Sequence, residues 1–482
     1  MKFRKMKVLL LNPPFKKKFS RTSRSPAVTR GGTIYYPIWL AYCAGVLDKA
    51  GFEIKIIDAP AENKDLPKVT EEAKKLDPEL IVIDTSTPSI ANDIKVAETL
   101  KGTFPKTFIV LVGTHPSVLP EETLNSGKKI DALAKGEYDY TIRDLARCLE
   151  SGGDLKNVEG LIFRRNGKII QNKTRELIRN PDELPFVSEV YKKHLNIKNY
   201  FFAASDYPMV MIMTGRGCAF RCFFCLYPQT FHSRVYRPRT PENVIAEFEY
   251  IVKNLPEVKE IAIEDDTFAV DKERVKKICR LLIGKKIKMK WYCNVRADLD
   301  LETMQWMEKA GCHLLTVGFE SGNQKILNNI RKGITIEQIR QFTNNSKKAN
   351  LLVHAAFMVG NPGETKKTME ETLKLAKELN CDSAQFYPLI VYPGTEAYEW
   401  ARQNNYLNTS DYQRWLDKKG GYASLVSQPQ LSAQEVLNFC NRATREYYLR
   451  PAYILMKAKQ IIFNPREIVR TLKAAKTFFK YL

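Results

Sequence analysis

The sequence lacks any long apolar run. Nowhere does it approach the roughly 18 to 20 consecutive apolar residues that a membrane-spanning helix requires. The N-terminus, Met1-Lys2-Phe3-Arg4-Lys5, leads into a short apolar segment typical of a strand and not into the core of a signal peptide. We therefore expect a cytoplasmic protein, whose 482 residues are enough for two or three domains with their own cores.

The sequence also lacks the paired cysteine spacings of a disulfide framework. Three of its ten cysteines lie close together, and the other seven are scattered along the chain: Cys43, Cys148, Cys279, Cys293, Cys312, Cys381 and Cys440. This pattern suits a reducing compartment, where thiols stay free. It also argues against a second complete cluster motif.

Acidic residues are nearly absent from the two ends of the chain. Residues 1–30 hold ten Lys or Arg and no acid, and residues 450–482 hold eight against one, Glu467, so most of the net charge of +22 lies at the ends. A nucleic-acid groove would interleave basic and aromatic residues, so we expect no nucleic acid. Basic, apolar terminal helices suit a peripheral contact with an anionic membrane, on its inner face. Solvated lysines are the alternative.

The segment from Thr214 to Cys225 contains the three clustered cysteines, Cys218, Cys222 and Cys225. A short glycine-led loop lets three thiolates at C-x3-C-x2-C spacing converge on a soft metal centre. A structural zinc site would need a fourth ligand, and His232 is too far along the chain to form a standard knuckle. A cubane iron–sulfur cluster held by three cysteines keeps one iron free for a substrate or cofactor. Zinc and three buried structural cysteines are the alternatives.

The first 150 residues alternate between strand and helix patterns. Strands are expected at 7–12, 54–58, 80–84, 108–113 and 132–134, with helices at 37–50, 68–76, 91–102 and 138–149. This alternation predicts an α/β, Rossmann-like doubly wound parallel sheet, whose ligand lies beyond the carboxyl ends of the strands. No G-x-G-x-x-G follows the first strand, so a dinucleotide site is not expected.

Polar residues and glycines stand at these strand ends. The candidate ligand contacts are Asn12, Ser86, Thr87, Gly113, His115, Gly136 and Glu137. His115 lies at a strand end, where it is either an ordinary loop histidine or a ligand contact.

A second α/β series follows a connector at residues 151–205, which includes a hairpin with an Asn166-Gly167 turn. Strands are expected at 209–214, 260–264, 289–294, 314–319, 354–359 and 383–389. We expect a partial (β/α)6 TIM-type barrel, with chemistry at its C-terminal strand ends. The predicted domains are 1–150, the connector 151–205, the barrel 206–410 and a helical, basic region 411–482.

The cysteine spacing, with the aromatic Phe224 before the last cysteine, resembles the signature of radical S-adenosylmethionine (SAM) enzymes. The resemblance implies that Cys218, Cys222 and Cys225 hold a [4Fe-4S] cluster, at which SAM is cleaved to a 5′-deoxyadenosyl radical. The expected SAM contacts are Phe224, Asp265, Asp266, Arg296, Glu320, Ser321 and Gly360. Among them, the guanidinium of Arg296 is suited to bind a carboxylate. No residue is assigned to the catalytic steps after radical formation, although Tyr227, Tyr292, Tyr387 and Tyr392 lie near strand ends.

The N-terminal strand ends, with Asn12-Pro13-Pro14 and Gly136-Glu137, resemble those of the cobalamin-binding domain that precedes the cluster domain in one class of these enzymes. That resemblance implies cobalamin as a further cofactor. The Asp-x-His-x-x-Gly motif that supplies a histidine to cobalt is absent, so cobalamin would lack that ligand. Within the class, the motifs look most like those of hopanoid and calditol lipid biosynthesis enzymes.

The leading hypothesis is therefore a radical SAM enzyme that activates an unactivated C–H bond of a bulky, lipid-linked substrate and closes or rearranges a ring. A cobalamin-dependent C-methyltransferase is the first alternative, and a non-catalytic cobalamin carrier or sensor is the second. The expected partners are a flavodoxin- or ferredoxin-like electron donor and the substrate. Helices expected at 433–449, 451–463 and from 464 onward would provide the membrane contact.

Overall fold

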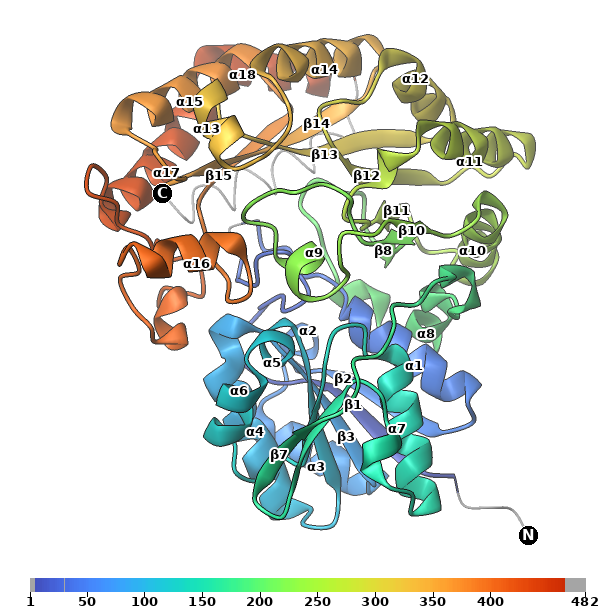
Figure 1. Cartoon of the computed structure of the whole chain (residues 1–482). Helices are drawn as coiled ribbons and strands as arrows, with labels where there is room; N and C mark the ends of the chain where they lie inside the picture. Colours follow the sequence, from blue (N-terminus) through green and yellow to red (C-terminus); the bar gives the residue numbers. More distant parts are fainter. Residues whose placement is uncertain (1–4, 30, 464–482) are drawn as a thin grey trace.

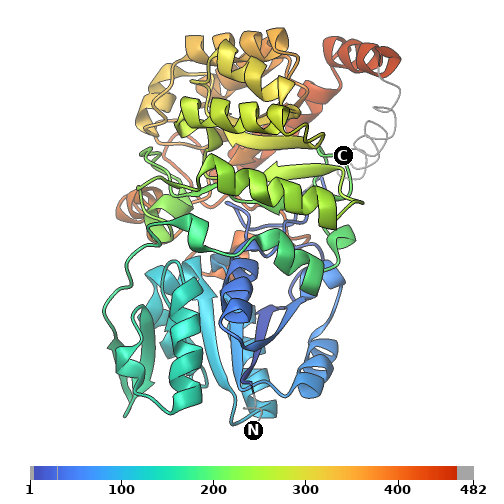
Figure 2. The same cartoon turned by 90° about the vertical axis from the view of Figure 1, so that its right-hand side faces the viewer.

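The computed structural model describes residues 5–29 and 31–463 of the chain. An N-terminal sheet and a C-terminal sheet form two tiers, with the short helix α9 (Leu226–Thr230) between them (Figure 1). Figure 2 shows the same two tiers after a quarter turn. α9 packs against α5 (Thr114–Val118) of the lower tier.

The N-terminal sheet has seven strands in the order β2-β1-β3-β4-β5-β6-β7. The first five are parallel, and β6 and β7 extend the sheet as an antiparallel hairpin. The strands are β1 (Lys7–Asn12), β2 (Glu53–Asp58), β3 (Leu80–Thr85), β4 (Phe108–Gly113), β5 (Ala132–Ala134), β6 (Leu161–Arg165) and β7 (Lys168–Gln171). The doubly wound sheet expected from the sequence is thus confirmed, with its topological switch between β1 and β3. The hairpin, which lies in the expected connector, is part of this sheet.

Both faces of this sheet are covered, and apolar side chains of its strands pack on each face. In β1, Val8 and Leu10 join one core, whereas Leu9 and Leu11 join the other. Successive side chains of a strand point to opposite faces, so a strand covered on both sides needs apolar residues throughout. The helices are α1 (Ile38–Lys49), α2 (Ala59–Glu62), α3 (Leu66–Leu76), α4 (Ile90–Thr103), α6 (Pro120–Ser126) and α7 (Asp139–Ser151), of which α1 packs with α7 and α3 with α4.

The C-terminal sheet is an open, all-parallel barrel segment. Its order is β15-β14-β13-β12-β11-β8, so the strands follow one another in sequence. They are β8 (Met209–Ile212), β11 (Glu260–Ile263), β12 (Lys290–Val295), β13 (Cys312–Glu320), β14 (Leu352–Val359) and β15 (Ser383–Pro388). This confirms the predicted partial barrel, in which all carboxyl ends of the strands meet at one rim.

Side-chain caps set where most of the outer helices begin. Thr240, Asp271, Asp300, Thr335 and Thr365 each accept a hydrogen bond from a backbone N–H of the first turn. The helices are α10 (Pro241–Asn254), α11 (Lys272–Gly284), α12 (Leu301–Lys309), α13 (Gln324–Asn329), α14 (Ile336–Lys348) and α15 (Lys366–Leu379). The pair β9 (Gly215–Arg216) and β10 (Arg237–Pro238) lies between β8 and α10 in sequence.

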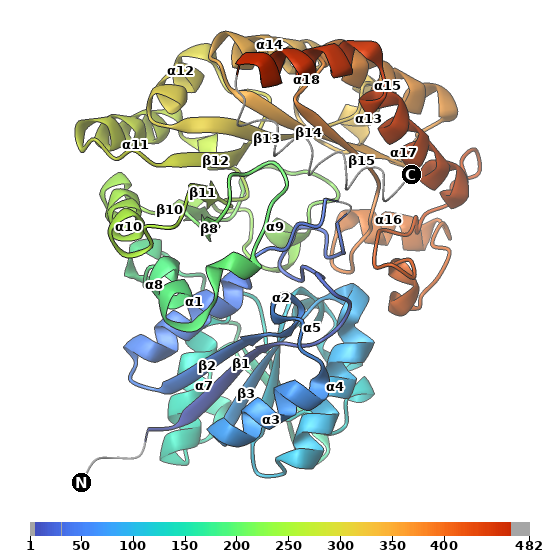
Figure 3. The same ribbon diagram turned by 180° about the vertical axis from the view of Figure 1, so that it is seen from behind.

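The C-terminal helices α16 (Glu396–Gln403), α17 (Ala433–Tyr448) and α18 (Pro451–Phe463) complete the upper tier (Figure 3). A capping box of Ser432 and Glu435 opens α17, the helix expected at 433–449. α17 packs along β15, where the Tyr447 hydroxyl donates to the Cys381 carbonyl at 2.6 Å. On α18, Leu455 and Ile462 are 62% and 73% exposed. The helix expected from 464 lies outside the described residues, and the peripheral membrane contact stays a prediction.

In the part of the chain that the structure describes, none of the helices combines the length and apolar character needed to cross a bilayer.

α8 (Val187–His194) links the two tiers through a buried carboxylate. Glu247 of α10 accepts hydrogen bonds from the Ser188 backbone at 3.2 Å and hydroxyl at 2.9 Å, and its other oxygen pairs with Arg239 at 2.5 Å. Glu247→Ala would leave the Arg239 guanidinium buried without its partner. We expect the free energy of unfolding to fall by about 3 to 5 kcal/mol in urea denaturation. Glu249 is on α10 as well, and Glu249→Ala removes its exposed ion pair with Lys285. This control should cost at most about 1 kcal/mol. Equal losses in the two variants would contradict the structural role of Glu247.

Candidate active site

The cysteine segment begins at β9, where the backbone conformation demands glycine. Gly217 has φ of 82°, and a Cβ there would lie 2.1 Å from the Val235 carbonyl oxygen. No other residue fits so close an approach. The chain therefore turns sharply between Arg216 and Cys218.

The middle of the segment is held by the barrel. The Phe223 amide donates to the Ile330 carbonyl at 3.0 Å. Gln229 of α9 donates to the carbonyls of Phe223 and Cys225 at 3.2 and 2.8 Å, and its amide oxygen accepts from the Glu396 backbone at 3.0 Å. These contacts fix the loop without using any cysteine sulfur.

Cys218, Cys222 and Cys225 are all half-buried and free. Burial raises the pKa of Cys218 to about 11, and burial together with neighbouring Asp266 raises that of Cys225 well above its usual range. Thiolates here need a cation to compensate them. Within residues 5–29 and 31–463, no three Cys, His, Asp or Glu side chains are close enough to share one metal ion. Ligands of a cubane cluster bind separate irons, so this spacing suits a cluster better than the zinc alternative.

The two aspartates after β11 have different surroundings. Both oxygens of Asp265 accept hydrogen bonds from Thr214, one from its backbone and one from its hydroxyl, each at 2.6 Å. Asp265 thus joins the ends of β11 and β8. The side chain of Asp266 is 4% exposed, yet its Oδ2 has no hydrogen-bond partner among the described residues. A buried, unpaired carboxylate oxygen beside the cysteines fits the ammonium group of SAM.

Arg296, after β12, is stacked on Phe220, with its guanidinium carbon 3.6 Å from the ring centroid. One terminal nitrogen donates to the Lys332 carbonyl at 2.6 Å, and the other lies 3.8 Å from the Cys222 sulfur. The guanidinium is held beside the cysteine loop by these contacts. It suits a carboxylate such as that of SAM.

Glu320 stands at the end of β13 in a left-handed conformation, with φ of 67°. Its carboxylate pairs with Lys332 at 2.7 Å and accepts from the Tyr387 hydroxyl at 3.0 Å. Burial lowers the pKa of Lys332, but the charges of Glu320 and Cys222 outweigh it and keep the amine protonated. The Lys332 ammonium also lies 5.9 Å from the ring of Phe224. Sequence reasoning missed Lys332, since a lysine after a short helix carries no motif.

Ser321 and Gly360 are engaged in packing. The buried Ser321 hydroxyl lies 3.2 Å from that of Thr372 on α15 and accepts from the Asn323 amide at 3.1 Å. Gly360 has φ of 88°, and its carbonyl accepts from Gln428 at 3.2 Å. The structure thus gathers Phe224, Asp266, Arg296 and Glu320 beside or near the cysteines, and uses the side chains of Asp265 and Ser321 within the protein. The assignment of all of these residues to SAM stays a prediction.

At the N-terminal sheet, several predicted contacts already have protein partners. Asn12 donates to Asp58 at 2.8 Å and accepts from Arg21 at 2.6 Å. The Ser86 hydroxyl lies 2.8 Å from that of Ser89, and Thr87 lies 3.3 Å from Nδ1 of His115. These contacts fix the side chains that follow β1 and β3.

His115 is buried, and burial lowers its pKa to about 3, so it is neutral. Gly113, before it, has φ of 116°, and a Cβ there would lie 2.3 Å from the Thr85 carbonyl oxygen. At Gly136 the nearest described atom to an added Cβ, apart from its chain neighbours, is the Phe231 carbonyl oxygen at 3.7 Å. This strand end therefore has room for the close approach of a ligand, as a cobalamin-binding edge requires.

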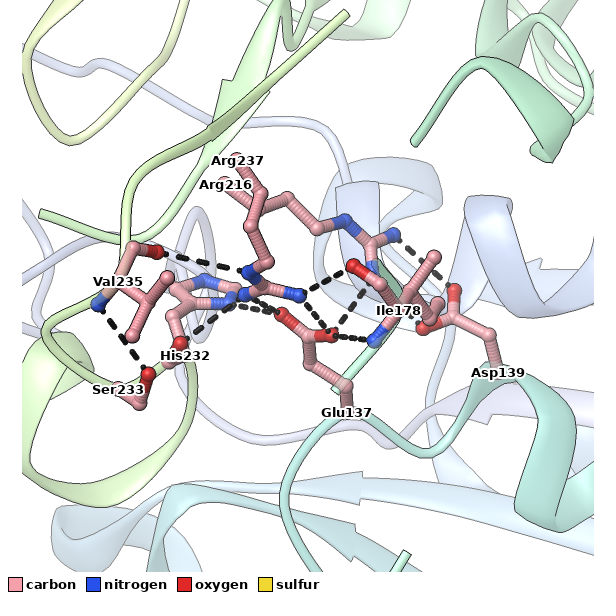
Figure 4. Close-up of polar contacts among 8 residues, drawn as sticks. All are labelled: Glu137, Asp139, Ile178, Arg216, His232, Ser233, Val235 and Arg237. Atoms are coloured by element: carbon pink, nitrogen blue, oxygen red, sulfur yellow. Dashed lines mark hydrogen bonds and ion pairs between the residues drawn. The ribbon is translucent and has the colours of Figure 1, made fainter. Parts of the chain in front are cut away.

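Glu137 is committed to contacts with the upper tier (Figure 4). It pairs with both terminal nitrogens of Arg237, at 2.8 and 2.5 Å, and with Nδ1 of His232 at 3.1 Å. Its predicted contact with cobalamin stays a prediction, and its observed role is in the joint between the tiers.

Residues 13–29, which follow β1, also reach the barrel rim. Arg24 donates to Glu264 at 2.6 Å and to the Asp265 carbonyl at 2.6 Å, and its Nε lies 4.0 Å from Asp266. The hydroxyl of Tyr227 donates to the Thr22 carbonyl at 2.6 Å. Arg24 was not among the predicted site residues, because a basic loop gives no sign of a distant acidic partner.

Family comparisons agree with this division of the chain. The family model described as the radical SAM superfamily matches residues 212–376, and the B12 binding domain matches residues 24–146. An uncharacterized methyltransferase of Pyrococcus horikoshii is 32% identical over 451 residues, which cover 93% of this chain and 94% of that protein. The anaerobic magnesium-protoporphyrin IX monomethyl ester cyclase of Cereibacter sphaeroides is 25% identical, over 91% of this chain and 71% of that one.

The fold is similar to that of TsrM from Kitasatospora setae, a radical SAM methyltransferase solved with cobalamin and a [4Fe-4S] cluster. The TM-score is 0.71 at 17% sequence identity, with 93% of this chain and 92% of that chain covered.

Asp266→Asn should weaken SAM binding to the anaerobically reconstituted protein by roughly ten- to a hundredfold, because a charge-assisted contact is worth about 1.5 to 3 kcal/mol. Equilibrium binding of SAM measures this. Asp265→Asn is the neighbouring comparison: it should mainly lower the free energy of unfolding, since Asp265 holds Thr214. Unchanged SAM affinity in Asp266→Asn would contradict the assignment.

The buried Asp84, at the end of β3, should make the free energy of unfolding depend on pH. Burial raises its pKa to about 7 from an ordinary 3.8, so the folded state binds a proton that the unfolded state releases. Its contribution to stability is therefore lost as pH rises from about 4 to about 7. The stability of the protein relative to Asp84→Asn should fall over that range, by a few kcal/mol at most. Urea denaturation of both proteins across the range measures the difference; a constant difference would contradict the prediction.

Proposed function

The chain belongs to the radical SAM superfamily and carries a B12-binding domain, and on that premise we propose that it transfers a methyl group from cobalamin to a carbon atom of its substrate. It is a radical SAM enzyme, whose cofactors are a [4Fe-4S] cluster, SAM and cobalamin. This gives preference to the C-methyltransferase, which the sequence offered as the alternative to ring formation.

The proposal rests on one observation: the edge of the N-terminal sheet, where cobalamin would bind, lies against the cysteine segment, where the cluster would bind. The loop that begins at Gly136 of the N-terminal sheet contacts the segment around the cysteines through buried ion pairs. α5, which follows β4, packs against α9, which follows Cys225. Methyl transfer requires the methyl donor and the substrate radical to meet, and this arrangement brings their two edges together. The methyltransferase relative that matches 93% of this chain gives further support.

When bound, the cluster supplies the electron that cleaves SAM, and cobalamin supplies the methyl group. Asp266 would accept the ammonium of SAM, and Arg296 would bind its carboxylate. Glu320, oriented by Lys332 and Tyr387, offers a fixed acceptor for a hydroxyl group. Burial and the charge of Glu320 raise the pKa of Tyr387 well above its usual range, so this phenol stays neutral.

The N-terminal domain would hold cobalamin without a histidine from the absent Asp-x-His-x-x-Gly motif. His115 is neutral and buried, with Thr87 at its Nδ1 and Glu122 4.0 Å from its Nε2. Both ring nitrogens thus face protein groups. We propose that His115 shapes the edge of the site.

Ring formation is the second candidate function, and the cyclase relative is the observation that favours it. The lipid-linked substrate and the link to lipid biosynthesis remain predictions that no contact of the described residues supports. The non-catalytic carrier is not retained, since the chain is a radical SAM enzyme. The enzyme needs an electron donor, for which we propose a flavodoxin- or ferredoxin-like protein.

Methyl transfer predicts a partial reaction that needs no substrate. In the reduced protein reconstituted with cluster and cobalamin, SAM should methylate cobalamin and release S-adenosylhomocysteine in an amount equal to bound cobalamin. Liquid chromatography with mass detection measures this product. A ring-forming enzyme would release 5′-deoxyadenosine alone, and that result would overturn the proposal.

Cys222→Ala separates the two uses of SAM. It should abolish 5′-deoxyadenosine, because the cluster loses one of its three ligands, and should leave S-adenosylhomocysteine formation by a chemically reduced cobalamin. Loss of both products would place the two reactions on one centre and contradict the assignment.

A further inference from the structure

Two carboxylates of the N-terminal domain bind three basic side chains around the cysteine segment (Figure 4). Asp139 pairs with the two terminal nitrogens of Arg216 at 2.8 and 3.2 Å. Glu137 pairs with Arg237 and His232, and it lies 3.9 Å from Arg216. We call these five residues the charge joint.

The charge joint is sealed from solvent. Its five members are between 0% and 6% exposed. Burial would raise the pKa of Glu137, but the hydrogen bonds from Arg237 and His232 and the charge of Arg216 lower it well below its usual range. Both carboxylates are fully paired in the interior, where an uncompensated charge costs several kcal/mol. The contacts are therefore stable and directional.

The basic members of the charge joint bracket the cysteines in the sequence. Arg216 is separated from Cys218 only by Gly217, and His232 follows α9, which begins directly after Cys225. Arg237 is the β-bridge partner of Arg216 in the β9–β10 pair. The barrel fixes the middle of the segment, whereas the N-terminal domain fixes its two ends.

The turn at Gly217 connects Arg216 to Cys218, the first of the three cluster ligands. A Cβ at Gly217 would lie 2.1 Å from the Val235 carbonyl oxygen, so the backbone here lies close against the chain that leads into β10. Arg237 also donates to the His232 carbonyl at 3.0 Å, which fixes the chain beyond the last cysteine. A displacement of either arginine would therefore move the loop from which the thiolates project.

We propose that Glu137 and Asp139 are positioning residues for the iron–sulfur cluster, acting on the cysteine loop through Arg216, Arg237 and His232. The domain that carries cobalamin thereby sets the geometry of the cluster in the other domain. The inference concerns the cluster alone and does not depend on methyl transfer.

The test compares Asp139→Asn and Glu137→Gln with the unchanged enzyme, each reconstituted anaerobically with iron and sulfide. The three cysteines remain, so a cluster should form. We expect an altered paramagnetic resonance spectrum, a shifted midpoint potential and a several-fold weaker binding of SAM, because the loop relaxes around the cluster. Unchanged spectrum, potential and SAM affinity in both variants would overturn the proposal.

Glu260→Gln is the matched control. Glu260 is a buried carboxylate at the opposite end of β11, where it accepts hydrogen bonds from the Ser205 hydroxyl at 2.8 Å and the Asp206 amide at 2.5 Å. It should lower stability and leave the spectrum and potential of the cluster unchanged. A shift as large as that of Asp139→Asn would show that general destabilisation causes the effect, which would also overturn the proposal.

Arg216→Lys covers the case in which Asp139→Asn or Glu137→Gln fails to fold. It keeps the charge and loses the paired geometry, so by itself it should shift the potential from that of the unchanged enzyme. Where Asp139→Asn folds, its shift provides a second comparison. The double variant Asp139→Asn with Arg216→Lys should shift it by less than the two single shifts combined, because both act through one contact. Additive shifts would overturn the proposal. Failure of S-adenosylhomocysteine to form would leave these outcomes unaffected and would count only against methyl transfer.

Discussion

The docking of the two tiers depends on buried ion pairs between them. An arginine cannot lose its proton in a protein, and the acids that face Arg216 and Arg237 compensate the cost of burying their charges. Asp139 and Glu137 meet that need from the other domain, with Glu137 only 3% exposed in its side chain. Because each pair is bidentate, the contacts specify direction as well as attraction. The two tiers therefore dock in one register.

Several other contacts follow from that register. With the tiers in place, residues 13–29 lie beside the barrel rim, where Arg24 compensates Glu264 and lies near Asp266. Tyr422, from the segment before α17, donates its hydroxyl to the Ser25 carbonyl at 2.9 Å and covers the same loop. The rim is thus contacted by chain from both ends of the sequence.

The fold could be predicted because both sheets are built from local patterns. Strands with a continuous apolar run, such as Leu80 to Ile83 of β3, alternate along the chain with helices and so specify parallel sheets from short-range information. The cysteine loop was predictable for the same reason, since its spacing is local. The positions of the strand ends followed from the topology, so their residues could be named in advance.

The partners of those residues could not be predicted. Asp265 and Asp266 are adjacent and identical in type, yet one binds Thr214, 51 residues earlier, and the other keeps a buried free oxygen. Glu137 stood in a motif that suggests a ligand contact, whereas Arg237, 100 residues later, takes both of its oxygens. Such choices depend on which distant charge is brought near, and neither periodicity nor spacing encodes this.

The short loop from Gly136 to Asp139 serves two neighbours at once. Its glycine leaves space at the edge of the N-terminal sheet, and its acids hold the cysteine segment of the barrel. The two family matches, at 24–146 and 212–376, fall on different domains, and this loop joins them. Its two acids are the partners that Arg216 and Arg237 of the barrel domain require. The N-terminal domain therefore contributes to the support of the cysteine segment as well as forming a sheet of its own.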